Sequence, residues 1–284
     1  MSDVLAPPSP PTEAGRKPRI SVTALLGNAM VRIVLVALAA ITLTPIAFMV
    51  WQSVRSQDGN SFTLASWKDV FGTSIVHASL VSFQLAAVSI VVGLLFGSTA
   101  AFAFAKLRFP GSQSLSATVI ALLLLPVQSY VITAYFNYAH LDLIGNVLAV
   151  GVLFGAIHLP FGIFVLTNFY RSISSELIEA GLLDGASYPQ VFFRIFLPLS
   201  KPALVTVCVL NFINVWNDLL ISLLFLPAGD SQPVSVAIAS TQVANVFDVH
   251  LVMAGSILSA IPGIVIYLIF QKEIAVGLTM GTGK

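Results

Sequence analysis

Four polar side chains recur at helical spacing within one long apolar run of this 284-residue chain. They are Asn211, Asn214, Asp218 and Ser222. A continuous helix over residues 202–226, turning about 100° per residue, places them within about 60° of one another. Amide, carboxylate and hydroxyl groups can replace the water shell of a polar solute one hydrogen bond at a time. They can equally bond neighbouring helices together, so a translocation pathway and interhelical bonding both remain open.

The sequence offers little material for catalysis or for metal binding. Asp218 is the one carboxylate within a predicted span, whereas a proton relay needs several titratable groups. The four histidines lie far apart along the chain, and Cys208 has no second cysteine with which to pair. His158, two residues before Pro160, is either a pH-sensitive group or a hydrogen-bonded structural histidine beside a kink. We therefore predict no catalytic residue and no metal site.

The composition identifies the medium in which these elements must fold. Hydrophobic residues make up 57% of the chain and charged residues only 9%, compared with roughly 25% charged in soluble domains. The formal net charge of +1 is too small for a surface that follows a nucleic acid backbone. The chain is therefore expected to be an all-α integral membrane protein that binds no nucleic acid.

Six apolar runs are long enough to cross a bilayer as helices. They lie near residues 33–51, 78–105, 115–138, 147–170, 202–226 and 251–270. If the N-terminus is cytoplasmic, every lysine and arginine except Arg55 and Lys68 falls on the cytoplasmic side. Because basic loops are retained there, this asymmetry predicts a multi-pass protein with both termini in the cytoplasm.

Residues 1–30 are proline-rich and polar, which predicts a disordered tail ahead of a membrane domain over residues 31–284. A cleaved signal peptide is the alternative, but the first apolar run is long and no small-residue cleavage pattern follows it. Gly93 and Gly97 share a four-residue spacing with Gly151 and Gly155. Such small residues serve either close helix packing or sliding surfaces in a moving transporter.

The loop over residues 171–201 is too long to be a simple connector. Ser174 or Ser175 can cap a short helix that ends at Asp184-Gly185. Ser187 can cap a second helix, with Pro189 in its first turn. The physics alone allows two roles for such a protruding helix pair, a cap on the bundle or a docking element.

This loop resembles the EAA loop of ABC-importer permeases. The match consists of Glu179-Ala180-Gly181, then Asp184-Gly185, then Ile195, Leu197 and Pro198, with three residues between Gly181 and Gly185 and nine between Gly185 and Ile195. The chain departs from the family at Gly181, where alanine is usual. Glycine lowers the local helix propensity, but we expect the docking surface to persist.

The resemblance extends over about residues 30–284 and is closest to carbohydrate-uptake permeases of the maltose-type, MalG-like branch. Further matching segments are Asp184-Gly185-Ala186-Ser187, Trp216-Asn217-Asp218, and Gln271-Lys272 with Ile274, Gly277, Leu278, Thr279 and Gly281. The resemblance implies the permease (MetI-like) fold of ABC importers, with six transmembrane helices and a cytoplasmic coupling-helix loop, in a bacterial inner (plasma) membrane.

The resemblance also implies that transport and ATP hydrolysis are carried out by different subunits. This chain would form half of the translocation pathway for a sugar or related polyhydroxylated solute. Its partners would be a second permease, two copies of an ABC ATPase that bind ATP and Mg²⁺, an extracytoplasmic solute-binding protein, and membrane lipid. The chain itself would be no enzyme and hold no cofactor, since a Walker A motif would need glycine where Leu278 stands.

Two other functions remain as alternatives. An autonomous secondary transporter or channel is motivated by the polar stripe and Asp218, and it would transport without ATP. A scaffold that transports nothing would use the cytoplasmic helix pair only to hold a partner.

Overall fold

The computed structural model describes residues 22–56, 61–72, 75–227, 229–241 and 248–281. Within these ranges the regular secondary structure is helical, apart from an isolated bridge between Arg55 and Phe62, and turns and loops join the helices. The helices are α1 (Val22–Ser53), α2 (Ala65–Gly72), α3 (Ile75–Lys106), α4 (Ser112–Ala121), α5 (Gln128–His140), α6 (Val147–Ser172), α7 (Glu176–Leu183), α8 (Tyr188–Val191), α9 (Leu197–Leu199), α10 (Lys201–Asn217), α11 (Leu220–Phe225), α12 (Val234–Thr241) and α13 (Val249–Gly281). A 3-10 turn, η1 (Leu122–Leu124), follows α4, and a π-helical turn, η2 (Phe192–Phe196), follows α8.

Residues Met1–Phe48 form one compact unit and Met49–Lys284 a second. In the first unit the described residues belong to α1, which starts at Val22 and therefore inside the segment predicted as a disordered tail. The apolar run that continues from this point extends the helix toward the N-terminus. Residues 1–21 of the predicted tail lie outside the described residues. The part of α1 from Met30 to Ser53 is long and apolar enough to cross a bilayer.

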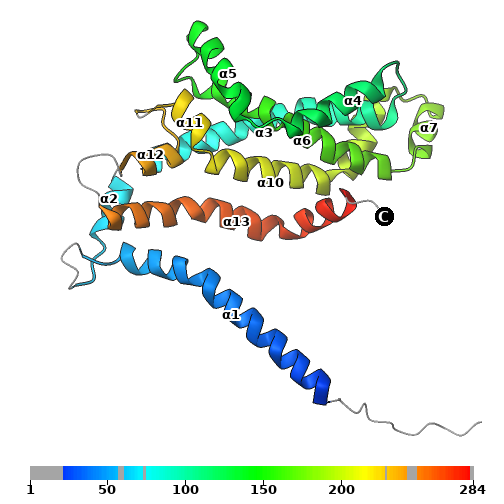
Figure 1. Ribbon diagram of the computed structural model, residues 1–284. Helices are drawn as coiled ribbons and strands as arrows, with labels where there is room; N and C mark the ends of the chain where they lie inside the picture. The colour runs from blue at the N-terminus through cyan, green and yellow to red at the C-terminus, as the bar shows by residue number, and fades with distance from the viewer. Residues whose placement is uncertain (1–21, 57–60, 73–74, 228, 242–247, 282–284) are drawn as a thin grey trace, which may run out of the picture. The chain divides into compact units, whose positions relative to one another are not determined.

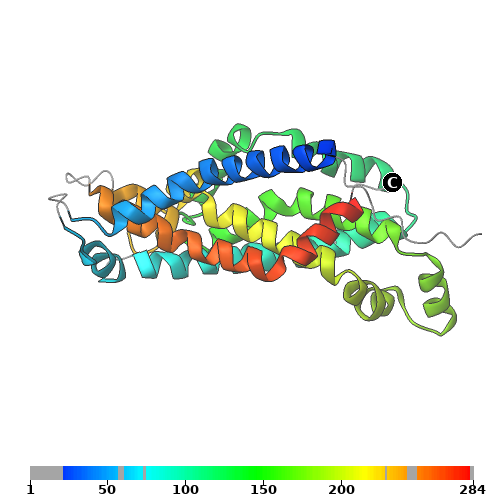
Figure 2. The same ribbon diagram turned by 90° about the horizontal axis from the view of Figure 1, so that it is seen from below.

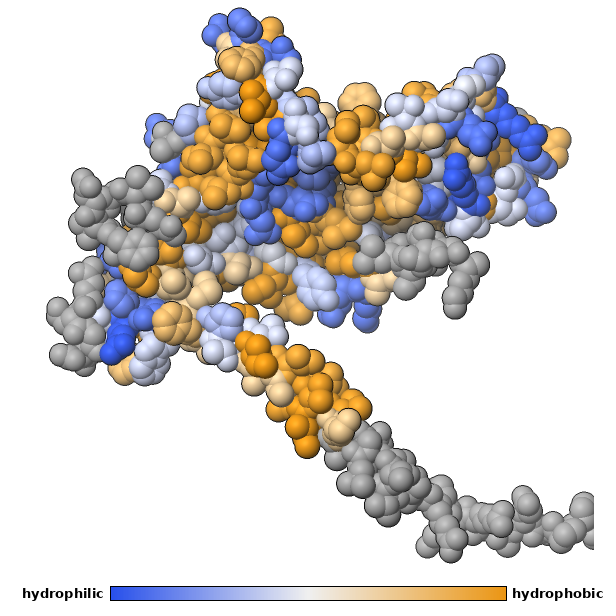
Figure 3. Space-filling model, viewed as in Figure 1, coloured by the Kyte–Doolittle hydropathy of each residue, from blue (hydrophilic) through white to orange (hydrophobic). Residues whose placement is uncertain are grey.

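In the second unit α3, α6, α10 and α13 run alongside one another as a helical bundle (Figure 1). Two apolar clusters make its core, one centred on Leu85, Phe154 and Phe225 and the other on Phe102, Tyr170 and Phe196. Short helices α7 to α9 protrude from one end of the bundle (Figure 2). Hydrophilic side chains gather at that end, whereas apolar side chains cover much of the face beside it (Figure 3).

The close packing of α3 on α6 depends on glycine. A Cβ atom placed on Gly151 would lie 2.7 Å from Val88 Cβ, and one on Gly155 would lie 2.6 Å from Val92 Cβ. Both distances are far below normal carbon–carbon contact, so the two backbones approach to a separation that no side chain at these positions would permit. The small-residue spacing thus serves helix packing here.

Four described helices are long and apolar enough to cross a bilayer, or up to six if each of two bent pairs is one span. The predicted run over 115–138 is not one helix, because the chain bends by 98° between α4–η1 and α5. Pro126 lies in this break and has no N–H with which to continue the helical bonding. The predicted run over 202–226 is also interrupted, since α10 ends at Asn217 and Asp218 has an extended ψ of 127°.

Candidate functional site

The protruding loop folds as a helix–turn–helix unit. The Glu176 N–H donates to Ser174 Oγ at 3.2 Å, and α7 then runs to Leu183. The turn follows as predicted, with Asp184 at the C-cap and Gly185 at φ +83°, in the left-handed region that glycine adopts without strain. The Ala186 N–H donates to the Gly181 carbonyl at 2.9 Å and closes the turn.

The second short helix begins at the predicted cap. Ser187 and Gln190 form a capping box, in which the Ser187 N–H donates to Gln190 Oε1 at 2.7 Å, and Pro189 lies in the first turn of α8. The chain then passes through η2 before α9, which begins at Leu197. The wider π turn directs Phe192 and Phe196 into the core near α3 and α6, so this half of the loop is held by aromatic packing.

The motif residues divide into an inner and an outer set. Gly181 is buried, and a Cβ atom there would lie 3.0 Å from Val191 Cγ2 and 3.5 Å from Ile195 Cδ1. Ile195 and Leu197 are half-buried, while Pro198 is exposed. Glycine at position 181 therefore allows α7 to pack tightly on the second helix, a contribution that helix propensity did not reveal.

The outer face of α7 combines acidic and apolar side chains. Glu176, Glu179, Ala180 and Asp184 are exposed, and Leu183 is 88% exposed. Because the carboxylates are exposed, their charges need no buried partner. The side chain of Leu183 would leave water only if another surface covered it. This face has the composition of a docking surface.

A lysine at the end of α3 forms hydrogen bonds that hold the loop against the bundle. Lys106 Nζ donates to the Ile173 carbonyl and, at 3.3 Å, to Ser175 Oγ, just ahead of α7. The same ammonium group lies 5.7 Å from the ring centroid of Phe196, within cation–π range. No local pattern indicates this role of Lys106, because the two segments that it joins are far apart along the chain.

The four polar residues of the predicted stripe do not share one face. Asn211 is only 5% exposed, and its Oδ1 accepts from Ser89 Oγ at 2.8 Å. Asn214 is exposed on α10, whereas Ser222 is fully buried on α11. The prediction assumed one continuous helix, and the break at Asp218 rotates α11 away from that register. Asn211 bonds α10 to α3, which is the interhelical alternative.

The break itself is stabilised by Asp218. Its Oδ1 accepts from the Ser222 N–H at 2.9 Å, and its carbonyl accepts from Ser235 Oγ at 2.6 Å. A side chain that offers the backbone this alternative bond competes with continuation of the helix. Just before the break, buried Trp216 donates from Nε1 to the Ser259 carbonyl at 2.9 Å and stacks on Phe212. Trp216-Asn217-Asp218 is therefore an anchored helix end.

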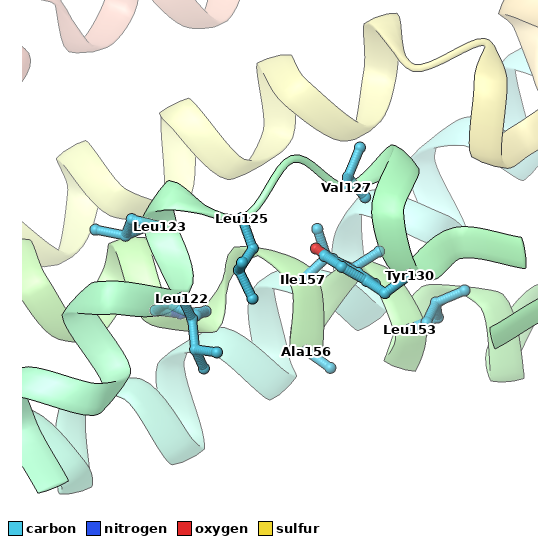
Figure 4. Close-up of a pocket in the computed structure, with 9 residues that line it drawn as sticks. Leu122, Leu123, Leu125, Val127, Tyr130, Leu153, Ala156 and Ile157 are labelled. Atoms are coloured by element: carbon cyan, nitrogen blue, oxygen red, sulfur yellow. The ribbon is translucent and has the colours of Figure 1, made fainter. Parts of the chain in front are cut away.

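An apolar cavity of about 520 Å³ lies where η1 bends into α5 (Figure 4). Leucines from η1, Tyr130 from α5 and Ile157 and Pro160 from α6 line it. Tyr130 supplies the one polar side chain among the described lining residues. The cavity follows from the break at Pro126, which leaves the corner unfilled.

Within the described ranges, no group of three His, Cys, Asp or Glu residues could hold a metal ion. His158 Nδ1 lies 2.9 Å from the Phe154 carbonyl, one turn earlier on α6. The Nδ1–H tautomer can donate to this carbonyl, so the contact supports the structural role for His158.

Comparison with known proteins places residues 93–275 in a single family model, described as the binding-protein-dependent transport system inner membrane component. The osmoprotective compounds uptake permease protein GgtD of Synechocystis sp. (strain ATCC 27184 / PCC 6803 / Kazusa) is 34% identical over 225 residues, 78% of this chain and 76% of that protein. The trehalose transport system permease protein SugB of Mycobacterium tuberculosis (strain CDC 1551 / Oshkosh) is 32% identical over 229 residues, 79% of this chain and 83% of that protein.

The fold also matches a solved structure. One chain of a bacterial ABC transporter involved in the import of the acidic polysaccharide alginate superposes with a TM-score of 0.80, covering 90% of this chain and 99% of that chain. At 24% sequence identity, the likeness concerns the fold alone.

Proposed function

The chain belongs to the family of inner membrane components of binding-protein-dependent transport systems, and from that premise we propose that it forms half of the translocation pathway of a sugar importer. It is a multi-pass permease subunit of an ABC importer and not its ATPase, since ATP binds to the partner ATPase and the permease family carries no cofactor. The proposed cargo is a sugar or related polyhydroxylated solute. The names of relatives that import trehalose, melibiose or α-glucosides support this class.

The observation that carries the proposed coupling role is the exposed face of α7. Glu179, Ala180 and Leu183 point away from the bundle, whereas Gly181 packs inward on Val191. We propose that this face seats in a cleft of the ATPase and that closure of the ATPase rocks the spans through α8, η2 and α9. The buried aromatic contacts of Phe192 and Phe196 support this, because a rigid connection is needed to transmit a movement.

We propose that the complete assembly contains a second permease, two ATPase subunits and an extracytoplasmic solute-binding protein. In this assembly the loop of the present chain at residues 171–201 faces the cytoplasm, and both ends of the chain lie on the same side. The distribution of lysine and arginine supports this orientation.

Purification of the tagged chain from native membranes in mild detergent tests the assembly. We expect mass spectrometry to identify an ATPase and a second permease among the bound proteins. Vesicles with the purified complex in their membrane and the binding protein outside should accumulate one of a panel of radiolabelled sugars only when ATP is enclosed on the side of the ATPase. Sugar transport by this chain alone, driven by an ion gradient, would instead establish the autonomous transporter.

For the pathway we propose that solute meets Asn214 and the partly exposed Asp218, whereas Asn211 and Ser222 act in packing. Asn214→Ala is therefore expected to lower sugar uptake about tenfold without changing the thermal midpoint, because the loss of one or two hydrogen bonds is worth about 1–2 kcal/mol.

Asn211→Ala is the matched variant, three residues earlier on the same helix. It should leave the sugar preference unchanged and lower the thermal midpoint of the purified protein, since Ser89 loses its buried acceptor. The pathway assignment fails if Asn214→Ala transports normally or if Asn211→Ala alone changes which sugar is carried.

A further inference from the structure

Two neighbouring cavities lie at the C-terminal end of α3, beside the protruding loop. One of about 540 Å³ is lined by residues 104–110 with Ser112 and Ser175, and the other of about 310 Å³ is lined by apolar and aromatic side chains. Leu107 belongs to both linings. The two cavities are therefore adjacent parts of one surface feature that differ sharply in chemistry.

The larger cavity is basic. Lys106 and Arg108 line it, and none of its described lining residues is acidic. Ser112 begins α4, whose N-cap residue Gly111 has no side-chain capping bond, so the positive end of the helix dipole adds to the same field. Hydroxyls of Ser112 and Ser175 supply further donors. This combination suits a phosphate group.

The smaller cavity is mainly apolar and lies between the end of α3 and the second half of the protruding loop. It is lined by Thr99, Phe102, Leu107, Tyr188, Pro189, Phe192 and Phe193. Thr99 precedes Lys106 by seven residues on a continuous helix, which places it about 10 Å deeper in the span. Phe193 is 61% exposed although it is a large apolar side chain. A chain of methylene groups would cover this surface.

From this arrangement we propose that the end of α3 binds an anionic phospholipid, with its phosphate at Lys106 and Arg108 and an acyl chain along Phe193 and Thr99. Lys106 marks the end of the α3 span, where phosphates of a bilayer lie, and Thr99 and Phe102, which precede it on the same helix, line the apolar cavity. Basic pockets between spans are a recurrent means of holding anionic headgroups. A soluble phosphate would leave the apolar cavity uncovered.

The site lies beside the coupling loop. Lys106, which would face the phosphate, also donates to the Ile173 carbonyl and to Ser175 Oγ. A bound headgroup would hold this ammonium group at the start of α7. The lipid would thus be a structural ligand of the segment proposed to dock with the ATPase.

Native mass spectrometry of the full chain in detergent micelles tests the proposal. The micelles contain either dioleoylphosphatidylglycerol or dioleoylphosphatidylcholine, and the affinity of the first bound lipid is compared. We expect a preference of roughly 30-fold for the anionic lipid, since each basic residue near a headgroup contributes about fivefold. Arg108→Gln should lower the preference about fivefold, while Arg171→Gln, an equally exposed charge outside the cavity, should not change it.

The apolar half has its own pair of variants. Phe193→Asp should lower retention of the anionic lipid at least fivefold, because it places a carboxylate in the proposed path of the acyl chain, whereas Leu199→Asp lies outside the cavity and should have no effect. Equal binding of the two lipids, or equal losses in a variant and its control, would overturn the proposal. Displacement of the lipid by millimolar inorganic phosphate would reassign the cavity to a soluble anion.

Discussion

Replacement of Glu179 by lysine is expected to abolish sugar uptake by the assembled importer without lowering the amount of this chain in the membrane. Glu179 is exposed on α7 and belongs to neither of the two apolar clusters of the bundle. Reversal of its charge would replace any attraction between this carboxylate and the ATPase by repulsion, and a cost of about 3 kcal/mol or more would lower uptake by at least about 100-fold. The measurement is initial uptake of the transported sugar, together with recovery of the ATPase on the tagged chain.

Asp69→Lys provides the matched control for this prediction. Asp69 is also exposed on a short helix, α2, which precedes α3 and lies outside the coupling loop. The same reversal of charge there should leave uptake and ATPase recovery unchanged. Normal uptake by the Glu179→Lys importer would contradict the docking role, and an equal loss in both variants would point to a general effect of charge.

Gly155→Ala is expected to destabilise the bundle strongly for so small a change. The added methyl group would lie 2.6 Å from Val92 Cβ and 3.2 Å from the Ser89 carbonyl oxygen, so α3 and α6 must move apart along their closest contact. Overpacking of this kind costs about 1–3 kcal/mol, which corresponds to a fall of about 3–10 °C in the thermal midpoint. Heating of the purified protein in detergent, followed by size-exclusion chromatography, gives the midpoint.

Gly263→Ala is the control, because a Cβ atom at this position of α13 meets nothing within 4 Å. Helix propensity favours alanine at both sites, so the midpoint of this variant should stay the same or rise. If the two variants had equal midpoints, the close approach of α3 and α6 would not be a feature of the native protein.

Local features of the fold were predictable from local residues. The turn at Gly185 and the cap at Ser187 occur where the sequence placed them, because each depends on neighbours within a few positions. The start of α1 was placed too late, since the residues from Val22 to Met30 are themselves mostly apolar and continue the helix ahead of the predicted run. The bend after Leu124 coincides with Pro126, but no local pattern gives its angle of 98°.

The polar stripe shows where periodicity stops being informative. Asn211 and Asn214 were assigned one face, yet Asn211 is buried against Ser89 and Asn214 is exposed. Ser222 lies on α11, beyond the break where Asp218 accepts from its N–H, so the single helix assumed for the stripe is interrupted. Ser89 itself gave no local indication of its role, since the bond joins residues more than a hundred positions apart.

By itself the sequence determined that this is a membrane-embedded helical permease with a loop of two short helices that resembles the EAA loop, because composition, charge distribution and the spacing of the loop motif are properties of the linear chain. Only the tertiary structure decided which polar groups join helices, why Gly181 faces Val191, and how Lys106 reaches Ser175. Each of these depends on which residue stands across a helix–helix contact. That neighbour is set by how all the helices pack together, and no local pattern encodes it.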